Sequence, residues 1–175
     1  MRIFRIASVV GVLFFLTAQA PVVQASAPSA FDPFVGQWSG ALEYKDYQGG
    51  TNRVKVPVTL EVKASDASTA SWYFNYDDFG KTVISDETHS WKSGKYVVKT
   101  KGKLEVQEYI SKDFAALVKS GIGKAVLMGS ETEIGRKVEV RRTITLERAK
   151  LTTLKETRVP GGTFEFRNQS TYSRQ

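Results

Sequence analysis

The chain has 175 residues, a formal charge of +7 and no cysteine. Without cysteine it can form no disulfide and carry no thiol-linked lipid, so its fold depends on a hydrophobic core. A chain of this length is large enough to bury such a core in one domain. The positive charge is compatible with anionic envelope surfaces or acidic small molecules as partners.

The first 25 residues have the order of a secretory signal peptide. Arg2 and Arg5 are followed by an apolar run over residues 6–16 and by a small residue, Ala25. The run is about half the roughly 20 residues that a membrane-spanning helix needs. We therefore expect residues 1–25 to be removed, and the mature chain to be exported, periplasmic or secreted, soluble, not lipidated and without a membrane span. Export also argues against nucleic acid as a partner.

Residues 26–35 are expected to form a flexible leader, and residues 36–175 a single domain. From Gly36 onward the hydrophobic pattern has a period of two, which is typical of strands with one buried face. The clearest case is residues 53–63, where valines and a leucine alternate with polar residues. Further strands are predicted at residues 37–47, 71–76, 81–91, 96–101, 104–110, 125–132, 137–147, 151–158 and 163–173.

One short helix is predicted at residues 111–120. Phe114, Leu117 and Val118 recur there at helical spacing, and Ser111 can cap the helix. Glycine-containing turns separate most of the strands, so hairpins dominate the connectivity. Antiparallel strands joined in this way avoid exposed edges by closing on themselves. The predicted fold is all-β, an antiparallel up-and-down barrel of about 8–10 strands.

A short motif opens the first strand: Phe34, Gly36, Trp38 and Gly40 alternate with other residues. With the meander that follows, it resembles the lipocalin and calycin superfamily, including its nitrobindin-like branch. The resemblance implies that Gly36 and Trp38 close one end of the barrel, with the tryptophan packed under a cation from a late strand. Nitrobindin-like barrels hold haem through a histidine near the C-terminus, and no histidine follows His89 here. We therefore expect no haem and no other cofactor.

Arg142 is a late-strand cation that is predicted to point inward. It falls on the same face as Val140 and Ile144 in the strand at residues 137–147. A charge in a barrel interior is costly unless it is paired. Its partner is left open: the Trp38 ring, a glutamate at the strand beginning at Ala125, or an anionic group of a ligand.

The other candidate ligand-binding residues are mostly aromatic. Tyr44 shares a face with Trp38, and two further aromatic faces lie on the strands at residues 71–76 and 163–173. If these faces point inward, the interior is apolar and suits a small apolar or amphipathic molecule. A barrel filled by its own side chains is the alternative, and a cavity above about 300 Å³ would favour binding. The candidate ligand-binding residues are Arg142, Tyr44, Trp72, Phe74, Tyr76, Met128 and Phe166.

Catalytic and metal chemistry have little support in the sequence. The pattern around His89, the only histidine, is too mixed to assign a face, and we interpret it as a surface or strand-pairing residue. One histidine with scattered carboxylates would make a weak metal site. Glu131 and Glu133 share a strand face and are candidates for acid–base chemistry if they are buried. No catalytic residue and no metal ligand is assigned.

The sequence therefore predicts an exported, non-catalytic binding protein for a small apolar or amphipathic ligand, anionic where it meets Arg142. Two alternatives stay open. One is an interaction module with a filled barrel, whose basic outer face meets an envelope protein or an acidic polymer. The other is an enzyme that uses inward carboxylates. We expect a monomer or a weak oligomer.

Overall fold

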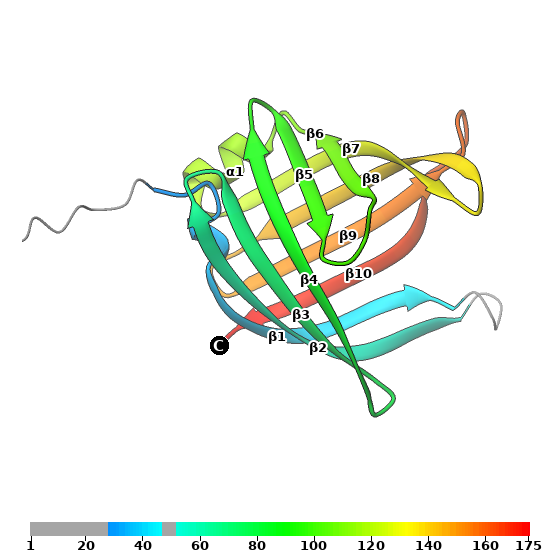
Figure 1. The fold of residues 1–175 in the computed structure, drawn as a ribbon, viewed down its shortest axis with the longest axis horizontal. Helices are drawn as coiled ribbons and strands as arrows, with labels where there is room; N and C mark the ends of the chain where they lie inside the picture. Colours follow the sequence, from blue (N-terminus) through cyan, green and yellow to red (C-terminus); the bar gives the residue numbers. More distant parts are fainter. Residues whose placement is uncertain (1–27, 47–51) are drawn as a thin grey trace, which may run out of the picture.

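The computed structural model describes residues 28–46 and 52–175, so the expected signal segment lies outside the described residues. Ten antiparallel strands close into one barrel in the order β1-β10-β9-β8-β7-β6-β5-β4-β3-β2 (Figure 1). The predicted fold class is confirmed. The strands are β1 (Gly36–Lys45), β2 (Arg53–Asp66), β3 (Thr69–Asp78), β4 (Lys81–Lys92), β5 (Lys95–Thr100), β6 (Val106–Ile110), β7 (Gly123–Glu133), β8 (Arg136–Leu146), β9 (Lys150–Arg158) and β10 (Glu165–Arg174).

The barrel closes where β1 pairs with both β2 and β10. Trp38 lies opposite Leu60 of β2 and Arg174 of β10. Gly40 lies two residues further along β1, where a Cβ atom would overlap the carbonyl oxygen of Thr171. Glycine at this position therefore allows the last strand to approach the first closely enough to seal the barrel.

Two short helical segments fill one end of the barrel, which we call the closed end. They are the 3₁₀ turn η1 (Asp32–Phe34) and the helix α1 (Phe114–Ser120). Phe34 stacks on Phe114 with ring centroids 6.0 Å apart. Asp113 occupies the N-cap position of the helix, and Ser111, the predicted cap, lies two residues earlier, where its Oγ accepts a hydrogen bond of 3.1 Å from the backbone N–H of Phe114. No helix in the described part of the chain is long and apolar enough to cross a membrane.

The expected flexible leader is packed against the core. Phe31 and Phe34 are completely buried, and Phe31 makes an edge contact with Tyr96 at 5.9 Å. The sequence predicts a flexible leader here because the segment lacks the period of a strand. Its aromatic side chains instead bury apolar area inside the closed end, which offsets the entropy of ordering the segment.

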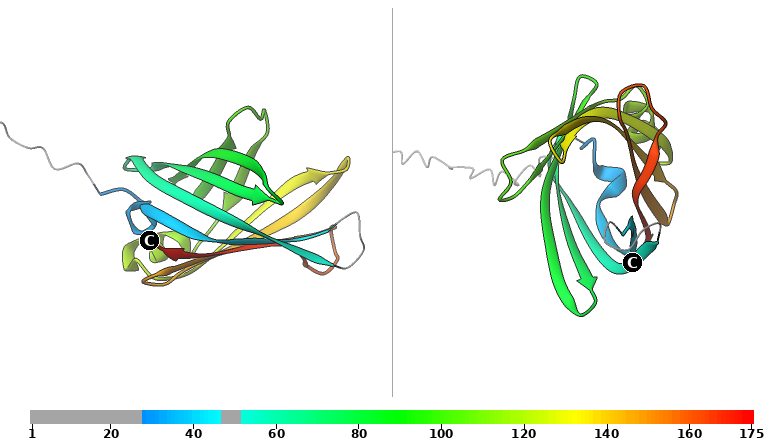
Figure 2. Two further views of the ribbon diagram at one scale, coloured as in Figure 1. Left: turned by 90° about the horizontal axis from the view of Figure 1, so that it is seen from below. Right: turned by 90° about the vertical axis from the view of Figure 1, so that its right-hand side faces the viewer.

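The opposite end, which we call the open end, carries the turns β3–β4, β5–β6, β7–β8 and β9–β10. The right-hand view in Figure 2 looks onto this end. The ladder is weakest between β6 and β7, which are in register only at Tyr109 with Gly129 and at Ile110 with Met128. Beyond these pairs β7 continues toward the open end without a strand partner on that side.

Candidate functional site

A cavity of about 200 Å³ lies inside the barrel, on the open-end side of the packed aromatic core. Leu42 and Phe74 supply its main apolar surface, while charged groups come from Glu87, Arg142 and Lys155. Its neutral polar lining consists of Tyr76, Thr153, Asn168, Ser170 and Tyr172. The interior around Arg142 is therefore mainly polar, which corrects the expectation of an apolar pocket with a few hydroxyl groups.

The cavity is small for a ligand site. Its volume of about 200 Å³ lies below the roughly 300–1,000 Å³ that is usual for drug-sized ligands. It corresponds to the liquid volume of about seven water molecules. The cavity therefore stays below the size that would favour binding: the closed half of the interior is filled with aromatic side chains, and the other half retains a small polar space.

The guanidinium of Arg142 points into the barrel, as the strand pattern predicts, and has few partners there. Its Nη2 donates a long hydrogen bond of 3.5 Å to Oε1 of Gln107, and its Cζ lies 5.4 Å from the centre of the Tyr109 ring. Among the described residues, no carboxylate oxygen lies within 4.0 Å of it. It is a half-buried cation without an ion pair among the described residues.

The glutamates expected as partners of Arg142 are bound to other cations. Glu131 accepts hydrogen bonds of 2.5 Å from Lys155 and 2.9 Å from the Tyr109 hydroxyl. Glu133 pairs with Arg167. Each of these two carboxylates is therefore neutralised by a neighbour on another strand, and the carboxylate left to balance the charge of Arg142 in the cavity is that of Glu87.

His89 is buried inside the barrel, so the surface alternative is wrong, while its place in the ladder opposite Ala70 and Val98 agrees with the strand-pairing alternative. Its Nε2 lies 2.9 Å from Glu87 and its Nδ1 lies 2.6 Å from the Tyr96 hydroxyl. The ring also stacks on Trp72 at 4.5 Å. An ionised Glu87 can only accept, so Nε2 carries the proton and Nδ1 accepts from Tyr96. This chain of hydrogen bonds joins the cavity wall to the closed-end core.

Burial and the nearby charged groups set the protonation states of His89 and Glu87. Burial lowers the pKa of His89, and its contact with Glu87 only partly opposes this effect, so the imidazole is neutral at pH 7. Burial raises the pKa of the Glu87 carboxyl, but the hydrogen bond from His89 and the charge of Arg142 outweigh burial and bring that pKa below its ordinary value. Glu87 thus stays ionised in the wall of the cavity.

Three of the seven candidate ligand-binding residues meet at the cavity: Arg142, Phe74 and Tyr76. Trp72 lies deeper, in the packed half, where its indole N–H has no hydrogen-bond partner among the described residues. Tyr44 is opposite Asn168 in the β1–β10 ladder, nearer to the open end, and does not line the cavity.

The remaining two candidates, Met128 and Phe166, lie on the outside of the barrel. Met128 is opposite the outward Arg141 and lines an external groove where β6 and β7 separate. Phe166 lies under the guanidinium of Arg53, 3.8 Å from its Cζ to the ring centroid. A register shift between Phe166 and Asn168 inserts one extra residue into β10. Since strands alternate faces, this bulge turns Phe166 outward while Tyr172 stays inside.

The late-strand cation beside Trp38 is Arg174. Its Cζ lies 4.2 Å from the centre of the Trp38 ring, and it donates hydrogen bonds of 2.7 and 2.8 Å to the carbonyl oxygens of Val35 and Pro33. The Trp38 indole N–H donates to the Phe34 carbonyl at 2.9 Å. Trp38 and Gly36 therefore sit at the closed end as the resemblance implies, but with a different arginine from the one considered in the sequence.

Sequence reasoning missed several polar groups of the cavity, chiefly Glu87, Lys155 and Ser170. Their strands carry polar residues on both faces, so alternation does not identify the inner one. A usable signal was the spacing of Glu87 and His89, which share a face two residues apart. Another was the position of Arg174 at the end of the last strand, which a closed barrel brings beside the first.

Comparisons with known proteins point to the fold. No family model matches the chain, and no curated protein matches it. Among solved structures, Rv2717c from M. tuberculosis aligns over 86% of this chain and 99% of its own, with a TM-score of 0.57 and 13% identity. The S-type phycobiliprotein lyase CPES from Guillardia theta aligns over 83% and 90%, with a TM-score of 0.54 and 12% identity.

A third structure, a DUF3598-family protein of unknown function from Nostoc punctiforme, has a TM-score of 0.50 and 13% identity. The match covers 90% of this chain but 53% of that one, so this chain spans about half its length. All three are similar in fold. The fold is that of the lipocalin-like barrels. At such low identity the likeness extends to the fold alone, and the function of this barrel must be argued from its site.

Proposed function

We propose that the protein binds a small anionic molecule in the polar cavity of the barrel, with Arg142 as its anchor. The observation that carries this proposal is the Arg142 guanidinium, which faces the cavity without a carboxylate within 4.0 Å among the described residues. A guanidinium has five N–H donors and stays charged at any physiological pH. A half-buried charge with one long hydrogen bond is only partly hydrated, and an anionic ligand would offset the cost of that lost hydration.

The free donors of Arg142 favour an anionic group in the ligand. Lys155 is paired with Glu131 at 2.5 Å, and Glu87 holds the neutral His89 at 2.9 Å. The charge of Glu87 balances that of Arg142 without contacting it, so the N–H donors of Arg142 are left for a ligand. A planar carboxylate would match its fork of donors with two parallel hydrogen bonds.

The other residues that line the cavity indicate the properties of the uncharged part of the ligand. Phe74 and Leu42 offer apolar contact, and the hydroxyl groups of Tyr76 and Tyr172 offer hydrogen bonds. Burial raises the pKa of Tyr172 to about 12, so this hydroxyl remains protonated and can donate. With a volume of about 200 Å³, the cavity suits an organic acid with a short aliphatic or single-ring body, a compact amphipathic anion.

The proposal includes export and a carrier role without catalysis. The order of charge, apolar run and small residue in residues 1–25 supports export. Pairing of Glu131 with Lys155 and of Glu133 with Arg167 removes the two carboxylates that acid–base chemistry would have used. The Gly36–Trp38 motif and the arginine over Trp38 support a place in the lipocalin and calycin superfamily.

Titration with benzoate, followed by NMR of the arginine side-chain N–H groups, tests the proposal. Benzamide, which has the same shape without the charge, is the matched ligand control. Benzoate should shift the Arg142 signal saturably and benzamide should not, because only the anion neutralises the guanidinium. Arg142→Met should abolish the binding, whereas Arg141→Met, which removes the neighbouring outward arginine, should leave it unchanged.

Acetate and inorganic phosphate extend the same titration to smaller and differently shaped anions. Saturable binding of any of the three that requires Arg142 supports an anion site. If none of them perturbs Arg142 in the folded protein, or if they bind equally well to Arg142→Met, the proposal is wrong.

A further inference from the structure

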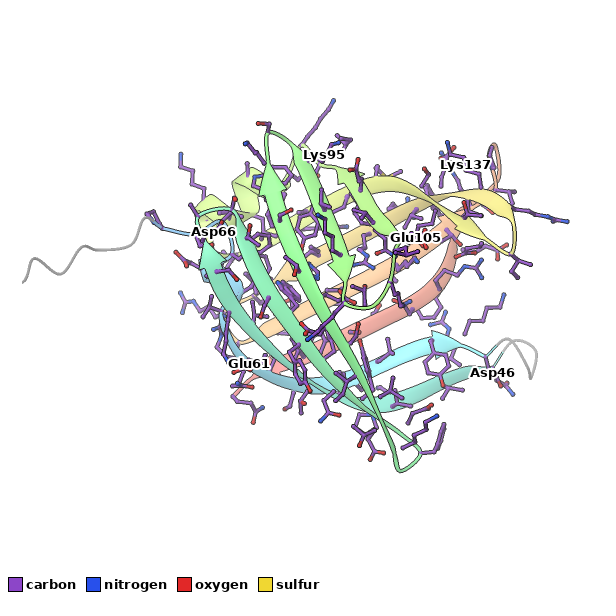
Figure 3. All side chains as sticks on the ribbon, in the orientation of Figure 1. Asp46, Glu61, Asp66, Lys95, Glu105 and Lys137 are labelled. Carbon is purple, nitrogen blue, oxygen red and sulfur yellow. The ribbon has the colours of Figure 1, made fainter. Side chains whose placement is uncertain are left out.

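Each described turn at the open end carries a large, exposed apolar side chain. Phe79 of the β3–β4 turn is 81% exposed and Val159 of the β9–β10 turn is 56% exposed, while Leu104 and Ile134 are fully exposed in the β5–β6 and β7–β8 turns. We call these four residues the apolar tips. Figure 3 labels Glu105, which follows Leu104 in the β5–β6 turn, and Lys137, the second residue of β8. Each of these side chains is exposed singly on its own turn, and what the four share is the end of the barrel that they occupy.

The turns at the closed end differ in composition. The hairpin turns at residues 67–68, 93–94 and 147–149 contain no exposed large apolar residue. Exposed apolar residues at that end, Val35, Ile110 and Ile122, lie outside the hairpin turns. The apolar tips are therefore a property of one end of the barrel.

Backbone conformation indicates that two of the tips serve a purpose other than turning the chain. Phe79 and Ile134 have φ of 54° and 49°, each followed by a glycine that also has positive φ. Asparagine or aspartate is the usual residue at the first position of such a two-residue turn. Positive φ is costly for bulky residues and especially for β-branched isoleucine. The equivalent closed-end turn has the small polar residue Ser93, with φ of 51°.

A cation adjoins each apolar tip in the sequence. These cations are Lys81, Lys103, Arg136 and Arg158. For Lys81, Lys103 and Arg136, no carboxylate oxygen of the described residues lies within 4.0 Å. Acidic neighbours are also present, such as Asp78 and Glu105, so the open end combines apolar tips with free cations rather than a strong positive field.

We infer that the open end docks onto an anionic lipid surface, with the apolar tips inserted among the lipids and the adjoining cations near the head groups. Insertion of apolar side chains with basic neighbours is the usual physical basis of peripheral membrane binding. The tips lie on separate turns around the barrel, and the β5–β6 turn is set back from the others (Figure 1). A fluid surface accommodates such separate anchors, whereas a protein partner would need a matching pocket for each.

Vesicle co-sedimentation of the full chain tests this inference. The probes are phosphatidylcholine vesicles with and without phosphatidylglycerol. The variant Phe79→Asn/Ile134→Asn replaces both strained tips by the residue that such turns prefer, so it should fold at least as well as the parent chain. Its partition onto anionic vesicles should fall about tenfold or more, because the burial of two large apolar side chains is lost. Ile122→Asn removes an exposed apolar residue from the closed end and should change nothing.

A local probe separates tip insertion from binding by residues 1–25, which are present in every variant. Phe79→Trp should show a blue-shifted emission and quenching by brominated lipid, whereas Ile122→Trp should show neither. The inference is overturned if the folded chain ignores anionic vesicles, if the tip variant binds them as the parent does, or if the tips capture a protein but no lipid. The Arg142→Met variant should bind anionic vesicles as the parent chain does, so the vesicle experiment tests membrane docking independently of the proposed anion site.

Discussion

Arg174 and Trp38 join the last strand of the barrel to the first. The guanidinium lies 4.2 Å over the indole ring and donates to the carbonyl oxygens of Val35 and Pro33, directly before the strand that carries Trp38. One side chain thereby holds the C-terminal strand, the N-terminal strand and the η1 turn together at the closed end. The contact combines a cation–π interaction with two charge-assisted hydrogen bonds.

Replacing this arginine should loosen the closed end. We expect Arg174→Ala to lower the free energy of unfolding by about 1–2 kcal/mol, a modest loss because the side chain is solvent-exposed. Arg174→Lys should recover little of it, since an ammonium cannot reach both carbonyls and stack on the ring. Urea denaturation measures the loss. Equal stability of all three proteins would contradict a structural role for the contact.

Replacement of Arg142, unlike that of Arg174, should not lower the free energy of unfolding. Arg142→Met removes a half-buried charge that has no ion pair among the described residues and replaces it by an apolar side chain of similar length. We expect the free energy of unfolding without ligand to stay the same or to rise by about 1 kcal/mol. A fall of about 3 kcal/mol or more, the usual result of breaking a buried ion pair, would instead mean that Arg142 is a structural residue. Urea denaturation of the ligand-free protein decides between the two.

The buried His89 should make the barrel sensitive to acid. Its pKa is lowered in the folded state from an ordinary value of 6.5, so below about pH 6.5 the unfolded chain takes up a proton that the folded chain does not. Stability should therefore fall as the pH drops through this range, by at most about 1.4 kcal/mol per pH unit. Glu87, whose pKa is also lowered, from 4.5, adds a further loss as the pH drops below about 4.5.

His89→Gln keeps a donor toward Glu87 but cannot be protonated. We expect it to flatten the dependence of the unfolding free energy on pH between about 6.5 and 5, measured by urea denaturation at a series of pH values. Glu108→Gln, on an exposed carboxyl, is the control and should keep the parent slope over that range. An unchanged slope in His89→Gln would mean that His89 is not the source of the acid sensitivity.

Gly40 should tolerate no side chain. A Cβ atom there would overlap the backbone of Thr171 and Tyr172, and neither strand can retreat without opening the seam between β1 and β10. We expect Gly40→Ala to cost about 3 kcal/mol or more in unfolding free energy. Ala41→Ser, at the next position on the opposite face of β1, should change the thermal midpoint little. A Gly40→Ala protein as stable as the parent would show that the seam can adjust.

Periodicity in the sequence was enough to determine the strands, the helix and the inward direction of Arg142. These features follow from local rules, because a strand with one buried face must alternate and a helix must recur every three to four residues. The Gly36–Trp38 motif, with the strand pattern that follows it, likewise predicted a closed barrel, which the fold confirms.

Only the tertiary structure decided which groups meet. One extra residue in β10 turned Phe166 outward, and strand alternation cannot reveal such a bulge. Arg174 rather than Arg142 covers Trp38, because closure of the barrel sets which strand ends are neighbours. His89 and Glu87 form a pair inside the barrel, and Glu131 binds Lys155 rather than Arg142. Alternation specifies a face, but the partner of a buried charge depends on register across strands distant in sequence.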